Sequence, residues 1–236
     1  MRNYFTLDGT DSRDFELYIS GQGTFDSPAR DVQFITVPGR DGDLIGLQTR
    51  LENGVLTYKN SFIVEDFDFN FRQFKAFLLA TTGYRRLIDT YHPSEYRLVA
   101  YTGRLSPDVT RRNNAGMFDI TFNAMPQRWL LSGETEQSFT SNGTITNPTA
   151  FPAKPLLTVY GAGTVTIGSV SVTISEADEY TVIDCEMGYC YKGATSKNRY
   201  VTLSGNDFPT LQPGSNGIQL GSGITQVKIK PRWWRV

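Results

Sequence analysis

The feature that most constrains this chain is a strict alternation of apolar and polar side chains. From Phe118 to Ala124 every second residue is apolar, and the residues between them are Asp119, Thr121 and Asn123. Successive side chains of a strand point to opposite faces, so the pattern predicts a half-buried strand over 117–124. Less regular alternation predicts further strands at 32–37, 55–64 and 96–101. The chain is therefore expected to be mainly β.

One segment has helical spacing instead. Within 70–80 the residues at positions 71, 74, 77 and 78 are all apolar and fall on one face of a helix. Asp68 or Asn70 can cap the N-terminus, and Gly83 suits the position after the C-terminus. A helix packed on a sheet explains this aromatic face better than a ligand site does.

The sequence of the C-terminal third predicts a series of short strands. The run 165–174 alternates on both sides of Gly168-Ser169, which fits a hairpin with a type II′ turn. Segments 180–184 and 189–192 predict a second hairpin, and 227–230 predicts the last clear strand. Many short strands separated by turn residues indicate a small β-sandwich.

The composition changes between the two β-rich parts. From 132 to 155, Gly, Ser, Thr, Asn and Pro dominate the sequence. Such residues favour turns and loops. We therefore predict an N-terminal domain at 1–132, a linker at 133–154 and a C-terminal domain at 155–236.

Composition and charge exclude several classes of protein. The 236 residues are 39% apolar and 20% charged, enough for a packed core, and the net charge of −1 lacks the basic excess of a nucleic-acid coat protein. No run approaches the roughly 18–20 apolar residues of a membrane helix. The first residues contain no apolar signal-peptide core, so folding in a cytoplasm is expected.

The sequence offers little for catalysis or metal binding. His92 is the one histidine, in an apparent loop, and no Gly-x-Ser-x-Gly motif accompanies it; a triad built on His92 stays open but is disfavoured. Cys185 and Cys190 lack a second ligand pair for zinc, and two free thiols are expected. The acidic residues do not match a calcium loop. We predict no enzyme, no cofactor and no metal.

The aromatic and basic residues near the C-terminus allow a partner contact. Trp233 and Trp234 are adjacent, so on a strand they point to opposite faces, and one of them can meet a partner or a glycan. Core or interface use is favoured over sugar stacking. The basic pairs 85–86, 111–112 and 232/235 can pair with acids of a neighbouring subunit.

Three stretches resemble a known family. The first is 37–44, which contains Pro-Gly-Arg-x-Gly after an early strand, and the second is 118–122 followed by Pro126 and Trp129. The third set lies in the C-terminal part: Ile183-Asp184-Cys185, Asn198, Gly205–Pro209, Leu211, Pro213, Gly214, Asn216 and Pro231–Trp233. In order and spacing the chain resembles the distal tail proteins (Dit) of long-tailed, siphovirus bacteriophages. Cys185, where a small polar residue is ordinary, is a mild departure.

The resemblance implies both fold and function. It implies an N-terminal β-sandwich with one α-helix and a protruding hairpin, and a C-terminal galectin-like β-sandwich. It further implies a homohexameric ring at the virion tail tip, assembled in the host cytoplasm. The ring would join the tail tube protein to the tail-associated protein and to receptor-binding or baseplate proteins. DNA would transit its channel without specific binding, and no membrane partner is implied.

The ring-forming contacts are expected in the N-terminal domain. The β-rich stretch 44–66 can project as a hairpin and wrap the next subunit. The candidate interface residues are Arg40, Leu44, Ile45, Leu47 and Leu51, although the leucines and the isoleucine could equally fill the subunit's own core. Two other functions compete with this hypothesis: a carbohydrate-binding module for host adhesion, and a cell-wall hydrolase, for which the sequence shows no catalytic constellation.

Overall fold

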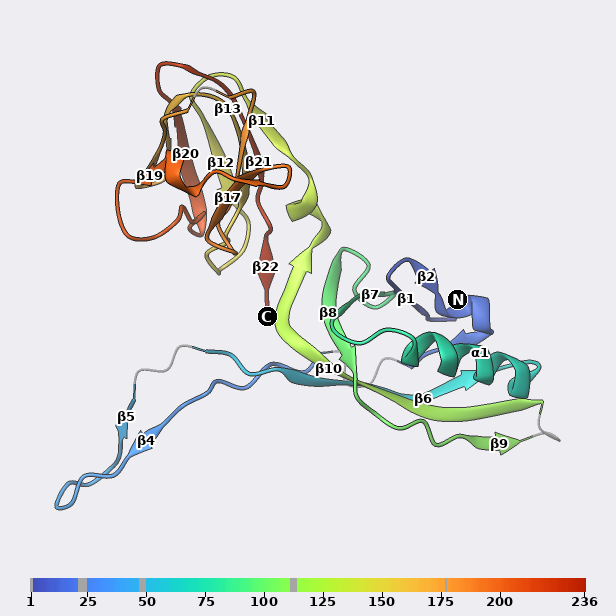
Figure 1. Cartoon of the computed structure of the whole chain (residues 1–236). Coiled ribbons are helices and arrows are strands. Elements are labelled where there is room, and N and C mark those ends of the chain that lie inside the picture. The colour runs from blue at the N-terminus through green and yellow to red at the C-terminus, as the bar shows by residue number, and fades with distance from the viewer. Residues whose placement is uncertain (1, 21–24, 47–49, 111–113, 177) are drawn as a thin grey trace. The chain divides into compact units, whose positions relative to one another are not determined.

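The protein is a two-unit, mainly β molecule with one α-helix. The computed structural model describes residues 2–20, 25–46, 50–110, 114–176 and 178–236 (Figure 1). One compact unit ends at Arg128, and a second spans Trp129–Arg235. The predicted fold class, mainly β with a helix, a protruding hairpin and a C-terminal sandwich, is confirmed.

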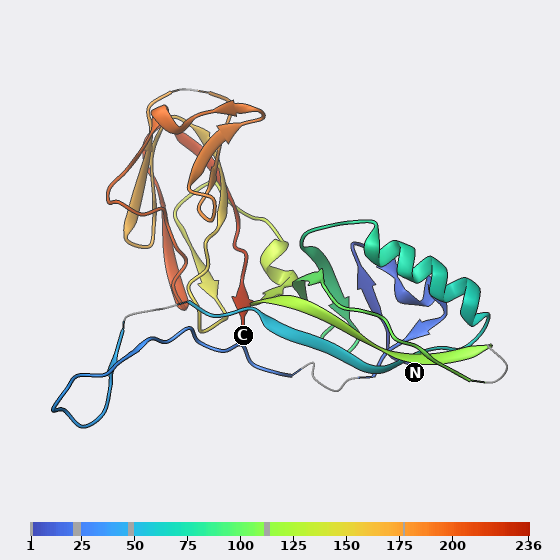
Figure 2. The same ribbon diagram turned by 60° about the horizontal axis from the view of Figure 1, so that its bottom comes forward.

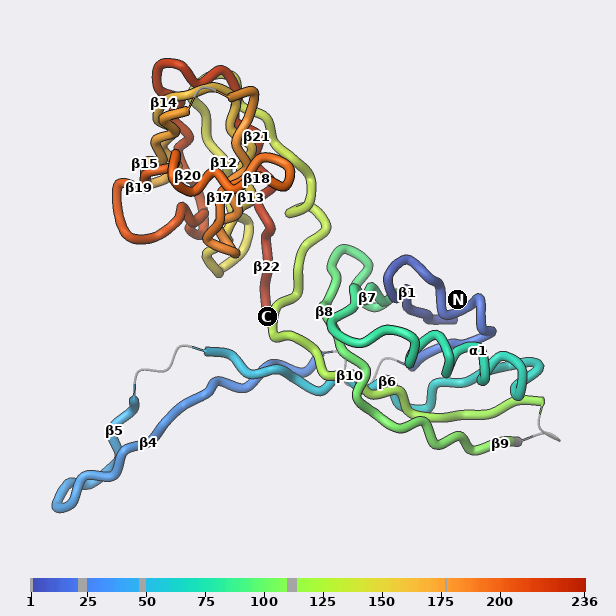
Figure 3. Tube along the Cα trace, in the orientation of Figure 1, coloured from blue at the N-terminus to red at the C-terminus, as the bar shows by residue number. Residues whose placement is uncertain are grey.

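The first unit is built on a large sheet whose strands pair in the order β2-β1-β7-β8-β10-β6-β3, with β9 beside β10 (Figures 1 and 3). A separate ribbon is formed by β4 and β5. The strands are β1 (Phe5–Leu7), β2 (Thr10–Asp11), β3 (Leu17–Tyr18), β4 (Phe34–Ile35), β5 (Leu44–Ile45), β6 (Gly54–Ile63), β7 (Arg85–Asp89), β8 (Glu95–Tyr101), β9 (Asp108–Thr110) and β10 (Ala115–Leu130). The short 3-10 helix η1 spans Ser12–Phe15.

This sheet curves until its two halves face each other. The ring of Phe5 on β1 stacks on Tyr58 of β6 with centroids 5.7 Å apart, and meets Phe122 of β10 edge-on at 6.2 Å. β1 is not a hydrogen-bonded neighbour of β6 or β10, so these rings meet across the core. The backbone N–H of Ile19, just after β3, donates to the carbonyl of Asn3, which draws the two ends of the sheet together. The unit therefore packs like a sandwich although its strands are continuous.

The helix α1 (Phe67–Leu79) closes the core of this unit. Phe74 and Leu78 are buried, as the apolar spacing predicts, and Phe71 meets Phe118 of β10 edge-on at 5.1 Å. The helix begins three residues earlier than position 70. Neither Asp68 nor Asn70 is its N-cap, because the chain enters the helix through a left-handed turn at residue 66, whose side chain makes no capping hydrogen bond.

The second unit is a sandwich of two sheets. One has the strand order β11-β21-β13-β16-β17-β18 and the other β12-β20-β14-β15-β19. Its strands are β11 (Gln137–Phe139), β12 (Gly143–Asn147), β13 (Leu156–Gly161), β14 (Gly163–Ile167), β15 (Val170–Ile174), β16 (Thr181–Asp184), β17 (Tyr189–Lys192), β18 (Thr195–Ser196), β19 (Val201–Leu203), β20 (Gly214–Leu220) and β21 (Ile224–Lys230). The short strand β22 (Trp234–Arg235) belongs to neither sheet and pairs with β10. The 3-10 helices are η2 (Leu131–Glu134) and η3 (Asn198–Tyr200). Both predicted hairpins are present, as β14–β15 and β16–β17.

The predicted linker at 133–154 is wrong. Its residues form β11 and β12, which pair with β21 and β20 at one edge of each sheet. Edge strands with one exposed face carry many small polar residues, so their composition resembles that of a linker. The second unit therefore begins near residue 129, at the end of β10.

Gly133 fixes the start of this unit against its end. The N–H of Arg232 donates to the Gly133 carbonyl over 2.8 Å, and a Cβ on Gly133 would lie 2.3 Å from the backbone nitrogen of Trp233. We expect Gly133→Ala to lower the free energy of unfolding by about 1–3 kcal/mol through this overpacking, measured by urea denaturation. Gly205→Ala is the control, because a Cβ there meets nothing within 4 Å. Equal stability of the two variants would contradict the close contact.

Candidate subunit interface

The ribbon that carries β4 and β5 forms an arm, defined here as the described residues 25–46 and 50–53. Its two segments run antiparallel, with Phe34 opposite Ile45 and Ile35 opposite Leu44. Main-chain bonds continue toward the base: Gly46 N–H donates to Gln33 (2.8 Å), Asp31 N–H to Arg50 (3.0 Å) and Glu52 N–H to Ala29 (2.9 Å). The arm pairs with itself and not with the large sheet (Figures 1 and 2).

The tip of the arm is a glycine-dependent turn. Gly39 and Gly42 have φ values of +82° and +78°, as the Pro-Gly-Arg-x-Gly pattern predicts, and an L side chain rarely adopts such values. The N–H of Arg40 donates to the carbonyl of Val37 over 3.2 Å, and the hydroxyl of Thr36 donates to Asp43 over 2.8 Å. The side chain of Arg40 is exposed at the end of the arm.

The arm is apolar on both of its faces. Residues directly opposite in an antiparallel pair share a face, so Phe34 and Ile45 lie on one side and Ile35 and Leu44 on the other. The first pair is 63% and 68% exposed, and the second pair 46% and 39%. Neither pair is covered by the rest of the described chain.

Exposure of this arm to water is unfavourable in free energy. An isolated two-stranded ribbon is marginally stable. Covering the exposed parts of these four side chains is worth about 4 kcal/mol, at roughly 2 kcal/mol for a fully buried side chain. That is about a thousandfold in an association constant. Exposed apolar surface of this kind marks an interaction site.

Four of the five interface residues predicted from the sequence lie along this arm, namely Arg40, Leu44, Ile45 and Leu51. Leu44 and Ile45 are exposed on it, so they do not fill the core of their own unit. Leu51 is partly buried and bridges to Arg30 near the base, whereas Leu47 lies outside the described residues. Two partners were missed, Phe34 and Ile35. They become recognisable once the strand at 32–37 is paired across the turn with 44–45.

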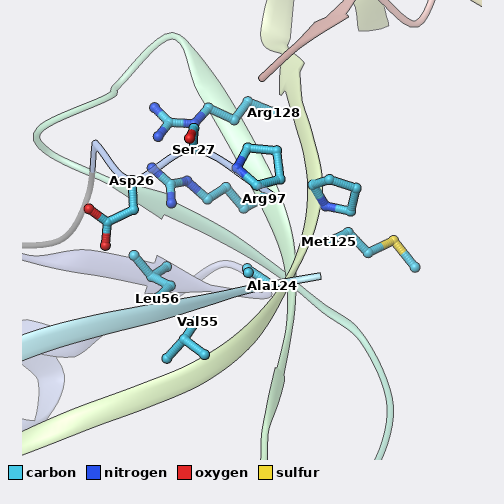
Figure 4. Close-up of a pocket in the computed structure, with 11 residues that line it drawn as sticks. Asp26, Ser27, Val55, Leu56, Arg97, Ala124, Met125 and Arg128 are labelled. Carbon is cyan, nitrogen blue, oxygen red and sulfur yellow. The ribbon is translucent and has the colours of Figure 1, made fainter. Parts of the chain in front are cut away.

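A pocket of about 270 Å³ lies where the arm meets its unit (Figure 4). It is lined by the arm residues 26–28, the start of β6, the 124–126 segment of β10, and the side chains of Arg97 and Arg128. Two buried carboxylates, Asp89 and Glu95, belong to the same unit and balance these two cations. Glu95 lies 3.4 Å from Arg128. The charge balance speaks against an anion site.

A buried phenol continues this polar cluster. The hydroxyl of Tyr58 donates to Asp89 over 2.7 Å, and burial together with the Asp89 charge raises the pKa of Tyr58 well above its ordinary value. The phenol therefore stays protonated and keeps donating. His92 lies beside the cluster, and burial lowers its pKa. Its Nδ1 is 3.4 Å from Glu95, and its ring meets Phe25 of the arm edge-on at 4.9 Å.

The two tryptophans near the C-terminus have separate roles. Trp233 is 3% exposed within the core of the second unit, so it cannot stack on a sugar or a partner, and this part of the site prediction is wrong. Trp234, on the opposite face as expected, stacks on Phe151 at 4.5 Å and donates its indole N–H to Pro152 over 2.9 Å. It retains a partly exposed surface.

Several residues of the family-like motifs turn out to tie the second unit together. Arg232 makes a bidentate pair with Asp184, at 2.7 and 3.0 Å. The Asn198 side chain accepts the N–H of Cys190 over 2.6 Å. Asn216 closes the preceding turn by accepting from the N–H of Gln212 and donating to its carbonyl, both over 2.8 Å. These positions therefore keep turns and strand ends in place.

The cysteines are buried free thiols in the structure. Burial raises the pKa of Cys185 far above its ordinary value and that of Cys190 to about 11. Within the described ranges no three His, Cys, Asp or Glu side chains cluster as a metal site would require. In the same residues no helix has the length and apolar character needed to span a bilayer.

Comparison with known proteins gives a fold match without a sequence match. No protein-family model matches the chain, and no curated protein matches its sequence. A crystal structure of the Dit protein of phage SPP1, described as a paradigm of the hub adsorption apparatus in phages that infect Gram-positive hosts, matches with a TM-score of 0.73 and 12% identity over 100% of both chains. A chain of the phage P2 baseplate in its activated conformation with Ca matches with a TM-score of 0.50 and 11% identity, covering 97% of this chain and 98% of that one.

These features define a two-domain fold, a β-rich unit with one helix followed by a β-sandwich. The SPP1 Dit protein shares that fold over its full length. The resemblance predicted from the sequence is thus confirmed for the fold.

The arm should be dispensable for the stability of its own chain. Because Phe34 and Ile45 are mostly exposed, the double variant Phe34→Ser/Ile45→Ser should change the free energy of unfolding of the dilute monomer by less than about 0.5 kcal/mol. Phe122→Ser, at a position that is 1% exposed, should cost about 3–5 kcal/mol. Urea denaturation measures both. A comparable loss in the arm variant would mean that the arm packs on its own unit.

The Arg232–Asp184 pair should stabilise the second unit in a pH-dependent way. Burial alone would raise the pKa of Asp184, but its hydrogen bonds from Arg232 and from two backbone N–H groups lower it overall. The stabilisation is therefore complete above the unfolded-state pKa of about 4 and is lost as the pH falls through the lowered folded-state value. Arg232→Ala should cost about 1.5–3 kcal/mol at pH 7, and the difference from wild type should shrink below about pH 4.

Urea denaturation across this pH range tests the pair. Lys154→Ala is the control, because Lys154 and Glu186 are 3.6 Å apart and about half exposed. That variant should lose less than about 1 kcal/mol at any pH. An Arg232→Ala defect that does not vary with pH would show that the ion pair is not its cause.

Proposed function

We propose that this chain is a structural subunit of a phage tail tip that self-associates through its arm into a ring. One observation carries the proposal: a two-stranded arm with exposed apolar side chains, on a fold that matches a phage Dit protein over its full length. The proposed role is structural and not enzymatic. Its place is the virion tail tip, after assembly in the host cytoplasm.

The geometry of the arm is compatible with a ring. Each copy offers one arm and one acceptor surface, and when each arm reaches the next copy in one direction the contact is heterologous. Such contacts close into a ring when the rotation between copies divides a circle. Six copies are the number we propose, by analogy with the family that the sequence resembles.

The ring is proposed to join other tail proteins. The first unit would meet the tail tube protein and the tail-associated protein, and the galectin-like second unit would face receptor-binding or baseplate proteins. DNA would pass through the channel without specific binding. The net charge of −1 supports this, because a strongly basic lining would retain phosphates.

Carbohydrate binding is the weaker candidate. The adhesion hypothesis depended on two adjacent tryptophans, and Trp233 lies within the core of its sandwich. Trp234 is held by Phe151 and Pro152, a contact that serves the fold of the unit. A glycan role would have to rest on other residues.

The mass of the full chain in solution tests the proposed function. Wild type should form a ring-sized oligomer in light scattering. The variant Phe34→Ser/Ile45→Ser removes most of the apolar surface on one face of the arm, worth about 2–3 kcal/mol for each contact. Association should therefore weaken roughly a hundredfold.

The control is Met187→Ser, which removes an exposed apolar side chain from the second unit, outside the arm and the surfaces of the first unit. It should leave the association constant unchanged within about twofold. If the arm variant assembles like wild type, the arm does not form the ring.

A further inference from the structure

We infer that the acceptor for the arm is a groove on the outer face of β6 and β10 in a second copy of this chain. The inference rests on the proposed ring function and names the surface that function requires. The groove is open to solvent, has a volume of about 500 Å³ and is lined by Arg2, residues 62–65 and residues 115–117.

The lining of the groove combines exposed polar atoms with apolar side chains of the sheet, among them Phe62 and Met117. Met117 lies directly opposite Phe62, and Phe62 directly opposite Tyr18, so the three side chains share one face. The rings of Tyr18 and Phe62 pack at 5.7 Å, and Met117 is 46% exposed. The neighbouring Phe118 points the other way, onto α1. The groove therefore lies on the side of the sheet that α1 does not cover.

The shape of this surface suits the arm. Both faces of the arm are apolar, so a flat or convex surface would cover one face and leave the other in water. A concave site can touch a ribbon on more than one face.

The charges of the two surfaces are also complementary. The tip of the arm carries Arg40, Asp41 and Asp43, and the rim of the groove carries Arg2 and Glu65. Each side thus offers both a cation and an anion to the other. Charged rims of this kind set the register of a contact more than its affinity.

A rival acceptor exists on the same unit. Phe69 and Leu79 of α1 are 64% and 62% exposed and lie along the outer side of the helix. These two side chains project from the convex surface of a single helix. That surface is the matched alternative against which the groove is tested.

Photo-crosslinking of the full chain locates the acceptor directly. Phe34 is replaced by p-benzoylphenylalanine, and isotopically labelled and unlabelled chains are mixed, so that crosslinks between copies are recognised by mass. We expect crosslinks between copies to fall within 62–65 and 115–117. Crosslinks to α1 or to the second unit would overturn the groove and leave ring formation by the arm intact.

Surface substitutions provide the second measurement. Met117→Asp should weaken self-association by at least about tenfold, since a charge would enter an apolar contact, while Phe69→Asp should have little effect. Thermal unfolding confirms that both variants are folded. If Phe69→Asp weakens self-association and Met117→Asp does not, the arm docks on α1 of the second copy. A wild-type chain that stays monomeric at all concentrations, with no crosslinks between copies, would overturn the proposed function and the groove together.

Discussion

The stacking of Phe5 on Tyr58, with Phe122 edge-on beside them, is the contact on which the first unit depends. It joins β1 to β6 and β10, neither of which is a hydrogen-bonded neighbour of β1, and turns one continuous sheet into two facing halves. Because α1 then completes the core with Phe74 and Leu78, the core needs nothing from the arm. A chain whose core is complete can keep its apolar arm for another molecule, and this division between core and arm underlies the proposed assembly.

Sequence patterns predicted which helices and strands form better than they predicted where each one begins and ends. The alternation at 117–124 identified β10, but not its extension to Leu130, where the pattern lapses. The aromatic spacing identified α1, while its start at Phe67 follows from a left-handed turn at Asp66 that no capping rule anticipates. The polar stretch 133–154 was wrongly predicted to be a linker, because edge strands and linkers have a similar composition. Local patterns report periodicity, whereas these boundaries depend on tertiary pairing.

The candidate interface could be predicted only in part, because it also depends on which strands pair in the folded chain. The turn at 38–43 and the apolar residues Leu44 and Ile45 are visible in the sequence, but the two-sided character of the arm depends on which residues stand opposite each other. That register places Phe34 beside Ile45. Likewise, the role of Asp184 depends on Arg232, which lies 48 residues away in sequence. With 12% identity to the SPP1 Dit protein, what the two chains share is the fold, and in this chain turn glycines and such long-range ties maintain it.

The buried thiols have a consequence for durability. A tail protein is made in a reducing cytoplasm and, in the role proposed here, then persists outside the cell. Oxidants attack the thiolate form, and the raised pKa of Cys185 and of Cys190 leaves very little thiolate at neutral pH. Burial also keeps dissolved oxidants from the sulfur atoms. The two cysteines of the second unit should therefore remain unoxidised thiols before and after release from the cell. Sulfenic acid formation should neither accompany its maturation nor limit its lifetime.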